Sequence, residues 1–170
     1  GAAKEITESF GCFYAACTLP VNLAECVIIT PGDGKMPRTG SVFAFLSKGD
    51  VYSVDPEMDL KWFNETLYER FKVVPQRLKV YKNKAEELVG NIDCSGKEVI
   101  IVGCHSHATI PAMLGVPRNY SKRHLVYLPC CNNVPENYTA KEFAKKTNFR
   151  MYSDPDVWSP KRTFFIWENI

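Results

Sequence analysis

Hydrophobic positions fall into short runs rich in β-branched residues, separated by stretches in which apolar residues recur at helical spacing. The clearest runs lie at 25–30, 50–54, 98–103 and 124–128, and the segment 58–71 shows the helical spacing best. Continuous apolar runs are typical of parallel strands that are buried on both faces, and their alternation with helices is typical of a sheet covered on both sides. The pattern predicts an α/β fold.

Weaker signals complete the sheet. Further strands are predicted at 77–81, 149–152 and 162–167. The last two form a closing hairpin, in whose core Trp158 is also expected to pack. Helices are predicted at 7–19, 38–47, 58–71, 84–89, 109–114 and 139–146. We therefore expect a doubly wound, mostly parallel seven-stranded sheet with helices on both faces and a C-terminal antiparallel hairpin. Residues 1–170 are interpreted as a single domain, with 1–22 as an N-terminal helical extension.

Composition narrows the class of protein. The chain is 45% hydrophobic and 24% charged, which is ordinary for a globular domain, and its net charge of +2 gives no overall attraction to nucleic acid. Seven cysteines form an odd set, which argues against a disulfide framework. No signal-like segment is present at the N-terminus, and no apolar run approaches the roughly 20 residues that span a bilayer. We expect a cytoplasmic protein without a membrane partner; its oligomeric state stays open.

Candidate binding residues follow the predicted strands, because ligands of doubly wound sheets bind at the carboxyl ends of the strands. The first strand is followed by a turn, Pro31–Gly34, in which two glycines flank Asp33 and permit close approach of a ligand to the backbone. Asp55 ends the next strand about twenty residues later, where an acidic side chain typically accepts hydrogen bonds from ribose hydroxyls. Turn and acid together predict an adenosine-type pocket; the simpler interpretation is that Asp55 caps the following helix.

These segments resemble a known family. Residues 28–34, the helix through 43–46 and residues 51–56 resemble the opening of class I S-adenosylmethionine-dependent methyltransferases. Residues 103–105 and 128–131 resemble a subgroup with a His-Ala-Cys-type turn after strand four and Pro-Cys-Cys after strand five. The resemblance extends over residues 23–167 as topology.

The resemblance implies that S-adenosylmethionine is the cofactor and that its methyl group is transferred to an unidentified acceptor. RNA or a nucleotide is one candidate acceptor, because of the basic residues described below. It places the two glycines of the turn near the methionine and ribose, Asp55 at the ribose hydroxyls and 83–85 beside the adenine. The implied cofactor-binding residues are Pro31, Gly32, Asp33, Gly34, Asp55, Asn83, Lys84, Ala85, Gly103 and Cys104.

His105 and His107 are candidate catalytic residues. An imidazole titrates near neutral pH, so either side chain could remove a proton from the acceptor as a general base. The alternative is that both histidines hydrogen-bond to loop carbonyls and shape the turn after the fourth predicted strand.

Departures from the family pattern support a second interpretation. Thr30 stands where the family usually has an acidic residue, and Met36 stands in place of a third glycine, although Asp33 could compensate in part. The Asn-Pro-Pro-Tyr signature and the Lys-Asp-Lys-Glu set of two methyltransferase groups are also absent. The alternative function is a catalytically inactive, methyltransferase-like binding module for a protein or RNA partner.

Two side-chain clusters carry further hypotheses. Zinc could be held by thiolate and imidazole ligands among Cys104, His105, His107, Cys130 and Cys131. Their spacing lacks Cys-x-x-Cys and adjacent residues tend to point apart, so no metal site is predicted. The basic residues, expected near the same edge of the sheet, either guide a nucleic-acid substrate together with Tyr120 or form an ordinary solvated rim; they are Lys35, Arg38, Arg118, Lys122 and Arg123.

Overall fold

The computed structural model describes residues 2–65, 76–129, 143 and 147–170. In chain order its principal elements are α1 (Ala2–Cys17), β1 (Val27–Pro31), α2 (Arg38–Leu46), β2 (Asp50–Val54), β3 (Leu78–Tyr81), β5 (Val99–Cys104), α3 (Ile110–Gly115), β7 (Arg123–Leu128), β8 (Arg150–Ser153) and β9 (Thr163–Trp167). Two short strands, β4 (Ile92–Asp93) and β6 (Pro117–Arg118), pair in parallel outside the main sheet.

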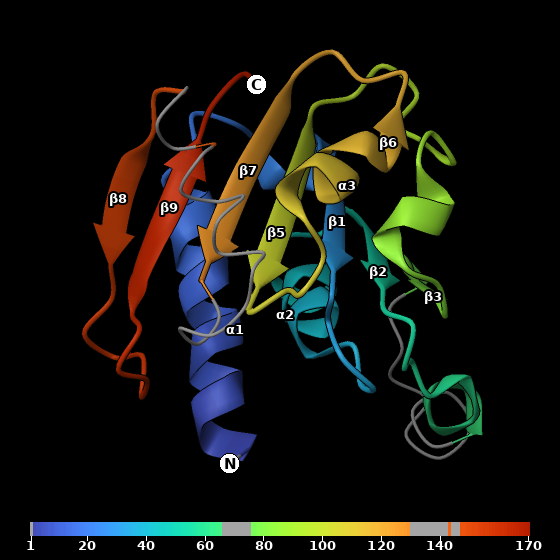
Figure 1. The fold of residues 1–170 in the computed structure, drawn as a ribbon, viewed down its shortest axis with the longest axis horizontal. Helices are drawn as coiled ribbons and strands as arrows, with labels where there is room; N and C mark the ends of the chain where they lie inside the picture. The colour runs from blue at the N-terminus through green and yellow to red at the C-terminus, as the bar shows by residue number, and fades with distance from the viewer. Residues whose placement is uncertain (1, 66–75, 130–142, 144–146) are drawn as a thin grey trace.

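The main sheet has seven strands in the order β3-β2-β1-β5-β7-β9-β8 (Figure 1). Strands β1, β2, β3, β5 and β7 are parallel, and β9 is antiparallel to both of its neighbours, β7 and β8. The predicted fold class is confirmed. The chain moves outward from β1 to β3 and then returns to β5, so the order reverses between β1 and β5, where open α/β sheets bind their ligands.

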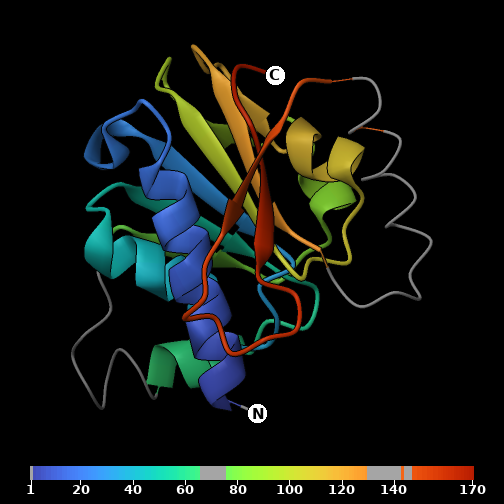
Figure 2. The ribbon, with the colours of Figure 1, turned by 90° about the vertical axis from the view of Figure 1, so that its left-hand side faces the viewer.

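Two hydrophobic cores lie on opposite faces of the sheet because successive side chains of a strand point to opposite sides. Ile28 and Ile100 pack in the core beneath α1 and α2, whereas Ile29 and Ile101 pack in the core beneath α3 and the 3-10 helix Ala85–Leu88. Figure 2 shows α1 and α2 on one side of the sheet and α3 on the other. Burial on both faces explains why the central strands carry apolar residues at successive positions.

Most predicted elements form close to their expected ranges. The first helix begins at Ala2 instead of residue 7, since the segment 2–5 consists of strong helix formers. Residues 60–65 of the predicted helix 58–71 are helical, while its remainder from 66 and nearly all of the predicted helix 139–146 lie outside the described residues. Over the described ranges, no helix combines the length and apolar character that a membrane span requires.

The closing hairpin packs as predicted with one exception. Phe164 and Trp167 are fully buried, and the Trp167 indole donates to Thr147 Oγ1 at 2.8 Å. Trp158 was expected in the same core but is 71% exposed. It precedes β9, where no strand pairing directs its ring inward, and its backbone amide donates instead to Thr7 Oγ1.

The amino end of α1 lies at the carboxyl edge of the parallel strands. In Figure 1 the strands β1, β5 and β7 point toward the same end of the molecule, and α1 begins beyond that end and runs back along the sheet. The first turns of α1 therefore lie beside the loops that follow the parallel strands.

Candidate functional site

Two adjoining cavities open at the carboxyl edge of the parallel strands. The Asp55 cavity, of about 540 Å³, is lined by Asp55, Ala85 and His107 among other residues. The Glu8 cavity, of about 440 Å³, lies against the first turns of α1. Both cavities are lined by Gly32, Gly34 and His105, so a single elongated ligand could extend from one cavity into the other.

Asp55 joins the ends of β1 and β2. Its Oδ2 accepts a hydrogen bond from the Gly34 amide at 2.8 Å, and its Oδ1 accepts one from the Glu57 amide at 2.7 Å. Asp55 therefore closes a local turn and orients the glycine turn, but it does not cap the following helix. That helix begins at residue 60, and Asp59 caps it by accepting from the Trp62 amide at 2.9 Å. Because a carboxylate has about four acceptor sites, the two bonds to Asp55 leave capacity for ribose hydroxyls.

The glycine turn requires its glycines for two reasons. Gly32 and Gly34 have φ values of 74° and 82°, which residues with a Cβ adopt only at a cost. At Gly32 a Cβ would also lie 2.9 Å from Ser106 Cα, so the loop after β5 packs directly against the turn. At Gly34 no atom lies within 4 Å of the Cβ position.

Asp33 lines the Glu8 cavity, but its carboxylate is committed to the protein. Oδ1 accepts from the Thr39 amide, and Oδ2 accepts from the Gly40 amide, the Ser53 hydroxyl and the Thr30 hydroxyl. Burial raises the pKa of Asp33 to about 6, although these donors oppose the rise. Asp33 thus caps the start of α2 and connects it to β1 and β2, a role that the glycine-flanked sequence did not predict.

Replacing Asp33 by Asn is expected to change the pH dependence of stability. The pKa of Asp33 in the folded state, about 6, exceeds its unfolded value near 4, so protonation stabilises the fold below about pH 4 and this contribution is lost as pH rises through 6. Between pH 4 and pH 7 the free energy of unfolding of the wild type should fall by roughly 2–3 kcal/mol relative to that of Asp33→Asn. Urea unfolding of both proteins between pH 4 and pH 7 measures this difference. A wild-type free energy of unfolding that rises with pH relative to the variant would contradict the raised pKa of Asp33.

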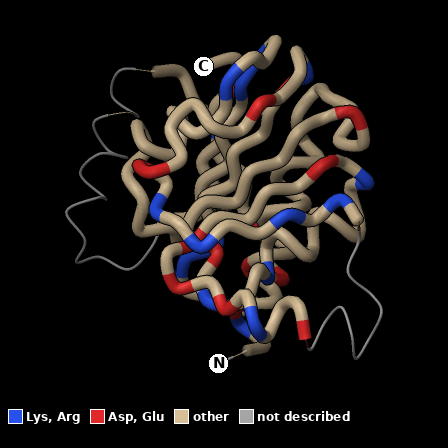
Figure 3. Tube along the Cα trace, turned by 90° about the vertical axis from the view of Figure 1, so that its right-hand side faces the viewer, with Lys and Arg blue, Asp and Glu red and all other residues tan. Residues whose placement is uncertain are grey.

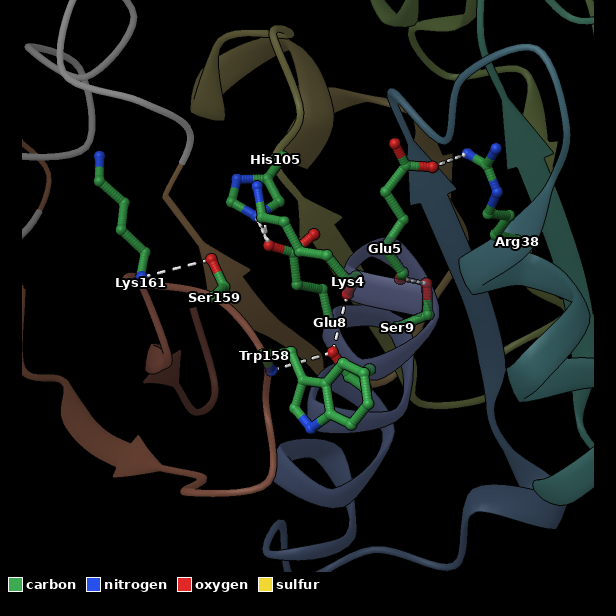
Figure 4. Close-up of polar contacts among 10 residues, drawn as sticks. Lys4, Glu5, Glu8, Ser9, Arg38, His105, Trp158, Ser159 and Lys161 are labelled. Atoms are coloured by element: carbon green, nitrogen blue, oxygen red, sulfur yellow. Dashed lines mark hydrogen bonds and ion pairs between the residues drawn. The ribbon is translucent and has the colours of Figure 1, made fainter. Parts of the chain in front are cut away.

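His105 makes the most unusual contact of the site. Its backbone has a φ of 52°, and its Nε2 lies 2.8 Å from Oε1 of Glu8, whose side chain is only 2% exposed (Figure 4). Lys4 Nζ lies 3.5 Å from the same carboxylate oxygen. Sequence analysis missed Glu8; the available signal was a charged residue four positions before Cys12, on the apolar face of α1.

Most of the predicted cofactor-binding residues line a cavity. The Asp55 cavity also contains Lys84 and both predicted catalytic histidines, His105 and His107, and the Glu8 cavity also contains Cys104. Three predicted residues line neither cavity; they are Pro31, Asn83 and Gly103. Pro31 is buried at the end of β1, the Asn83 amide donates to Glu87 Oε2, and Gly103 packs against the ring of Tyr127.

The predicted basic rim is divided between two ends of the sheet. Three of the basic residues lie at or before the amino end of β7, at the edge of the sheet opposite the cavities; they are Arg118, Lys122 and Arg123. They begin or precede the strand instead of following it, so they do not reach its carboxyl end. Arg118 pairs with Asp93 at 3.5 Å and Lys122 with Glu98 at 3.4 Å. The expectation of one common edge is wrong, and basic and acidic positions are interspersed in the view of Figure 3.

The cysteine and histidine cluster is only partly described. Across residues 2–65, 76–129, 143 and 147–170, no group of three or more His, Cys, Asp or Glu side chains is placed to hold a metal ion. Cys130 and Cys131 of the zinc hypothesis lie outside these ranges.

Comparison with known proteins identifies the fold. No protein-family model matches the chain. No curated protein sequence matches it either. Among solved structures, a SAM-dependent O-methyltransferase from Thermotoga maritima matches with a TM-score of 0.58 at 11% identity, over 94% of this chain and 64% of the other.

Two further structures agree. The 1,6-didemethyltoxoflavin-N1-methyltransferase of Burkholderia thailandensis, bound to S-adenosylhomocysteine, matches with a TM-score of 0.56 at 13% identity over 94% and 78% of the chains. A SAM-dependent methyltransferase of Aquifex aeolicus matches with a TM-score of 0.54 at 11% identity over 92% and 88%. The chain therefore has the fold of class I S-adenosylmethionine-dependent methyltransferases.

Proposed function

We propose that this protein binds S-adenosylmethionine across the two cavities and transfers its methyl group to an acceptor. The observation that carries the proposal is the glycine turn after β1, joined through the Gly34 amide to Asp55 at the end of β2. This pair lies where the strand order reverses, in a chain with the methyltransferase fold. The absence of a Cβ at Gly32 and Gly34 leaves the backbone open to close approach by the cofactor.

Individual residues would hold separate parts of the cofactor. Asp55 would accept hydrogen bonds from the ribose hydroxyls, and Lys84 and Ala85, which line the same cavity, would flank the adenine. When bound, the cofactor supplies a methyl group on a sulfonium centre. The protein's contribution is then chiefly to hold the acceptor in line with that group.

His105 is the stronger candidate for the general base because it lines both cavities. Since Nε2 faces the Glu8 carboxylate, Nδ1 is the nitrogen left to accept a proton from the acceptor. The Glu8 carboxylate would stabilise the imidazolium that results. His107 lines the Asp55 cavity alone, which places it second for this role.

The acceptor would approach through the Glu8 cavity. Its lining balances the basic Lys4, Arg38 and Lys161 against the acidic Glu5, Glu8 and Asp33, so its charges favour no acceptor class. A nucleotide or an RNA end is the acceptor class to test first. Transfer of a radioactive methyl group from labelled cofactor to total RNA or to mononucleotides would identify such an acceptor.

A catalytically inactive binding module remains the second candidate. One observation favours it: Asp33, the acidic residue of the turn after β1, already accepts four hydrogen bonds from the protein and has no free acceptor site for the cofactor. Such a module would bind a protein or RNA partner without methyl transfer.

Calorimetric titration with S-adenosylmethionine and S-adenosylhomocysteine tests the proposal. We expect saturable binding near one to one and an increase in melting temperature, because a ligand that binds only the folded state stabilises it. No heat and no thermal stabilisation at millimolar ligand would contradict the proposal and favour the binding module, whose partner would then be sought by affinity capture.

A further inference from the structure

Glu8 carries a buried charge that needs compensation. Its side chain is 2% exposed on the packed face of α1, beside Ser9 and Cys12. A carboxylate removed from water costs several kcal/mol unless cations or hydrogen-bond donors surround it. The groups that face Glu8 therefore indicate what this position is built to bind.

The other carboxylates of the Glu8 cavity are already neutralised or saturated. Asp33 accepts four hydrogen bonds, and Glu5 forms an ion pair of 2.6 Å with Arg38. Glu8 has weaker compensation within the protein. Lys4 is 3.5 Å away with its side chain 44% exposed, and the contact with His105 is short but not aligned as a hydrogen bond, since Glu8 Oε1 and His105 Nε2 are both buried without one.

The position of Glu8 relative to the Asp55 cavity suggests its ligand. A ligand whose ribose is held by Asp55 would pass over Gly32 and Gly34, the residues common to both cavities, before reaching Glu8. An S-adenosyl amino acid has this elongated form, with adenosine at one end and an ammonium group at the other. The ammonium would give the buried carboxylate a hydrogen-bonded cation, whereas the half-exposed Lys4 approaches it only to 3.5 Å.

We propose that Glu8 binds the ammonium group of the cofactor's amino-acid portion, an inference that rests on the proposed function. Glu8 is then a specificity-determining residue, through which the site selects adenosyl sulfonium and thioether ligands that carry an ammonium group over those that lack it. The carboxylate contacts His105 and the ammonium together, as its roughly four acceptor sites allow. The N-terminal helix thereby becomes part of the cofactor site.

A thermodynamic cycle tests this inference. Calorimetry compares S-adenosylhomocysteine with its desamino analogue, which has hydrogen in place of the amino group, on the wild type and on Glu8→Gln. We expect the wild type to bind the desamino analogue roughly 10- to 100-fold more weakly, the range for a charge-assisted hydrogen bond. We expect Glu8→Gln to bind both ligands with affinities within about threefold of each other, because the carboxylate that distinguishes them is gone.

Glu98→Gln is a matched control. Glu98 contacts the buried His124 at 3.1 Å and Lys122 at 3.4 Å, the same combination of partners as Glu8, but it precedes β5 at the opposite end of the sheet. This variant should keep the wild-type preference for the amino group. If Glu8→Gln does not fold, Glu8→Asp replaces it and should keep the preference in part, because the charge remains.

The outcomes separate the two proposals. Failure of the wild type to bind S-adenosylhomocysteine at all overturns the proposed function together with this inference. Tight binding with equal affinity for the desamino analogue, or a preference that Glu8→Gln leaves intact, overturns the role of Glu8 and leaves the proposed function standing.

Discussion

Gly32→Ala is expected to lower the free energy of unfolding by about 3 kcal/mol and to abolish binding of S-adenosylhomocysteine. An Ala at a φ of 74° costs roughly 1–2 kcal/mol, and its Cβ would lie 2.9 Å from the backbone of Ser106. Overpacking of this kind adds about 1–3 kcal/mol, because a backbone atom cannot move aside as the end of a flexible side chain can. Movement of the Ser106 loop would also displace His105, which lines both cavities.

Gly34→Ala is the control that isolates the steric contribution. Its φ of 82° imposes a similar conformational cost, but no atom lies within 4 Å of the new Cβ. We therefore expect a loss of only about 1–2 kcal/mol from Gly34→Ala. Urea unfolding of the two variants measures the difference. Equal losses would show that the Ser106 loop does not pack against the turn as the structure indicates.

Asp55→Ala is expected to weaken binding of S-adenosylhomocysteine by at least about 100-fold. Two hydrogen bonds from ribose hydroxyls to a carboxylate are worth roughly 1.5–3 kcal/mol each, so losing both corresponds to about 10²- to 10⁴-fold. The Gly34 and Glu57 amides also lose their acceptor, which should cost the fold about 1–3 kcal/mol. Calorimetry below the unfolding transition of the variant measures the affinity separately from stability.

Asp154→Ala controls for damage to the local turn. Like Asp55, Asp154 precedes a proline, is nearly buried and accepts a hydrogen bond from the amide two residues later, in this case Asp156 at 2.9 Å. It lines neither cavity. Asp154→Ala should lose stability but keep the affinity for the ligand. Affinity within threefold of the wild type in a folded Asp55→Ala protein would remove Asp55 from the ribose site.

The sheet could be predicted because its residues repeat a local pattern. Strands buried on both faces need apolar residues at consecutive positions, and 99–102 have them. The short β4–β6 pair escaped prediction, because Ile92–Asp93 and Pro117–Arg118 are too brief to show any periodicity. Arg118 and its basic neighbours were placed at the wrong end of the sheet, since spacing along a chain does not show which end of a strand a loop occupies.

Sequence alone determined the α/β class, the order of the strands and helices of the main sheet, and the glycine turn, because each depends on residues close together in the chain. The acid at Asp55 could be predicted only from its fixed place at the end of the next strand. Only the tertiary structure decided which partner each buried carboxylate contacts. Asp33 turns inward because the first amides of α2 need an acceptor, and Glu8 meets His105 only because α1 packs along β5. Both outcomes depend on contacts between separate elements, where the cost of burying a charge selects its partner.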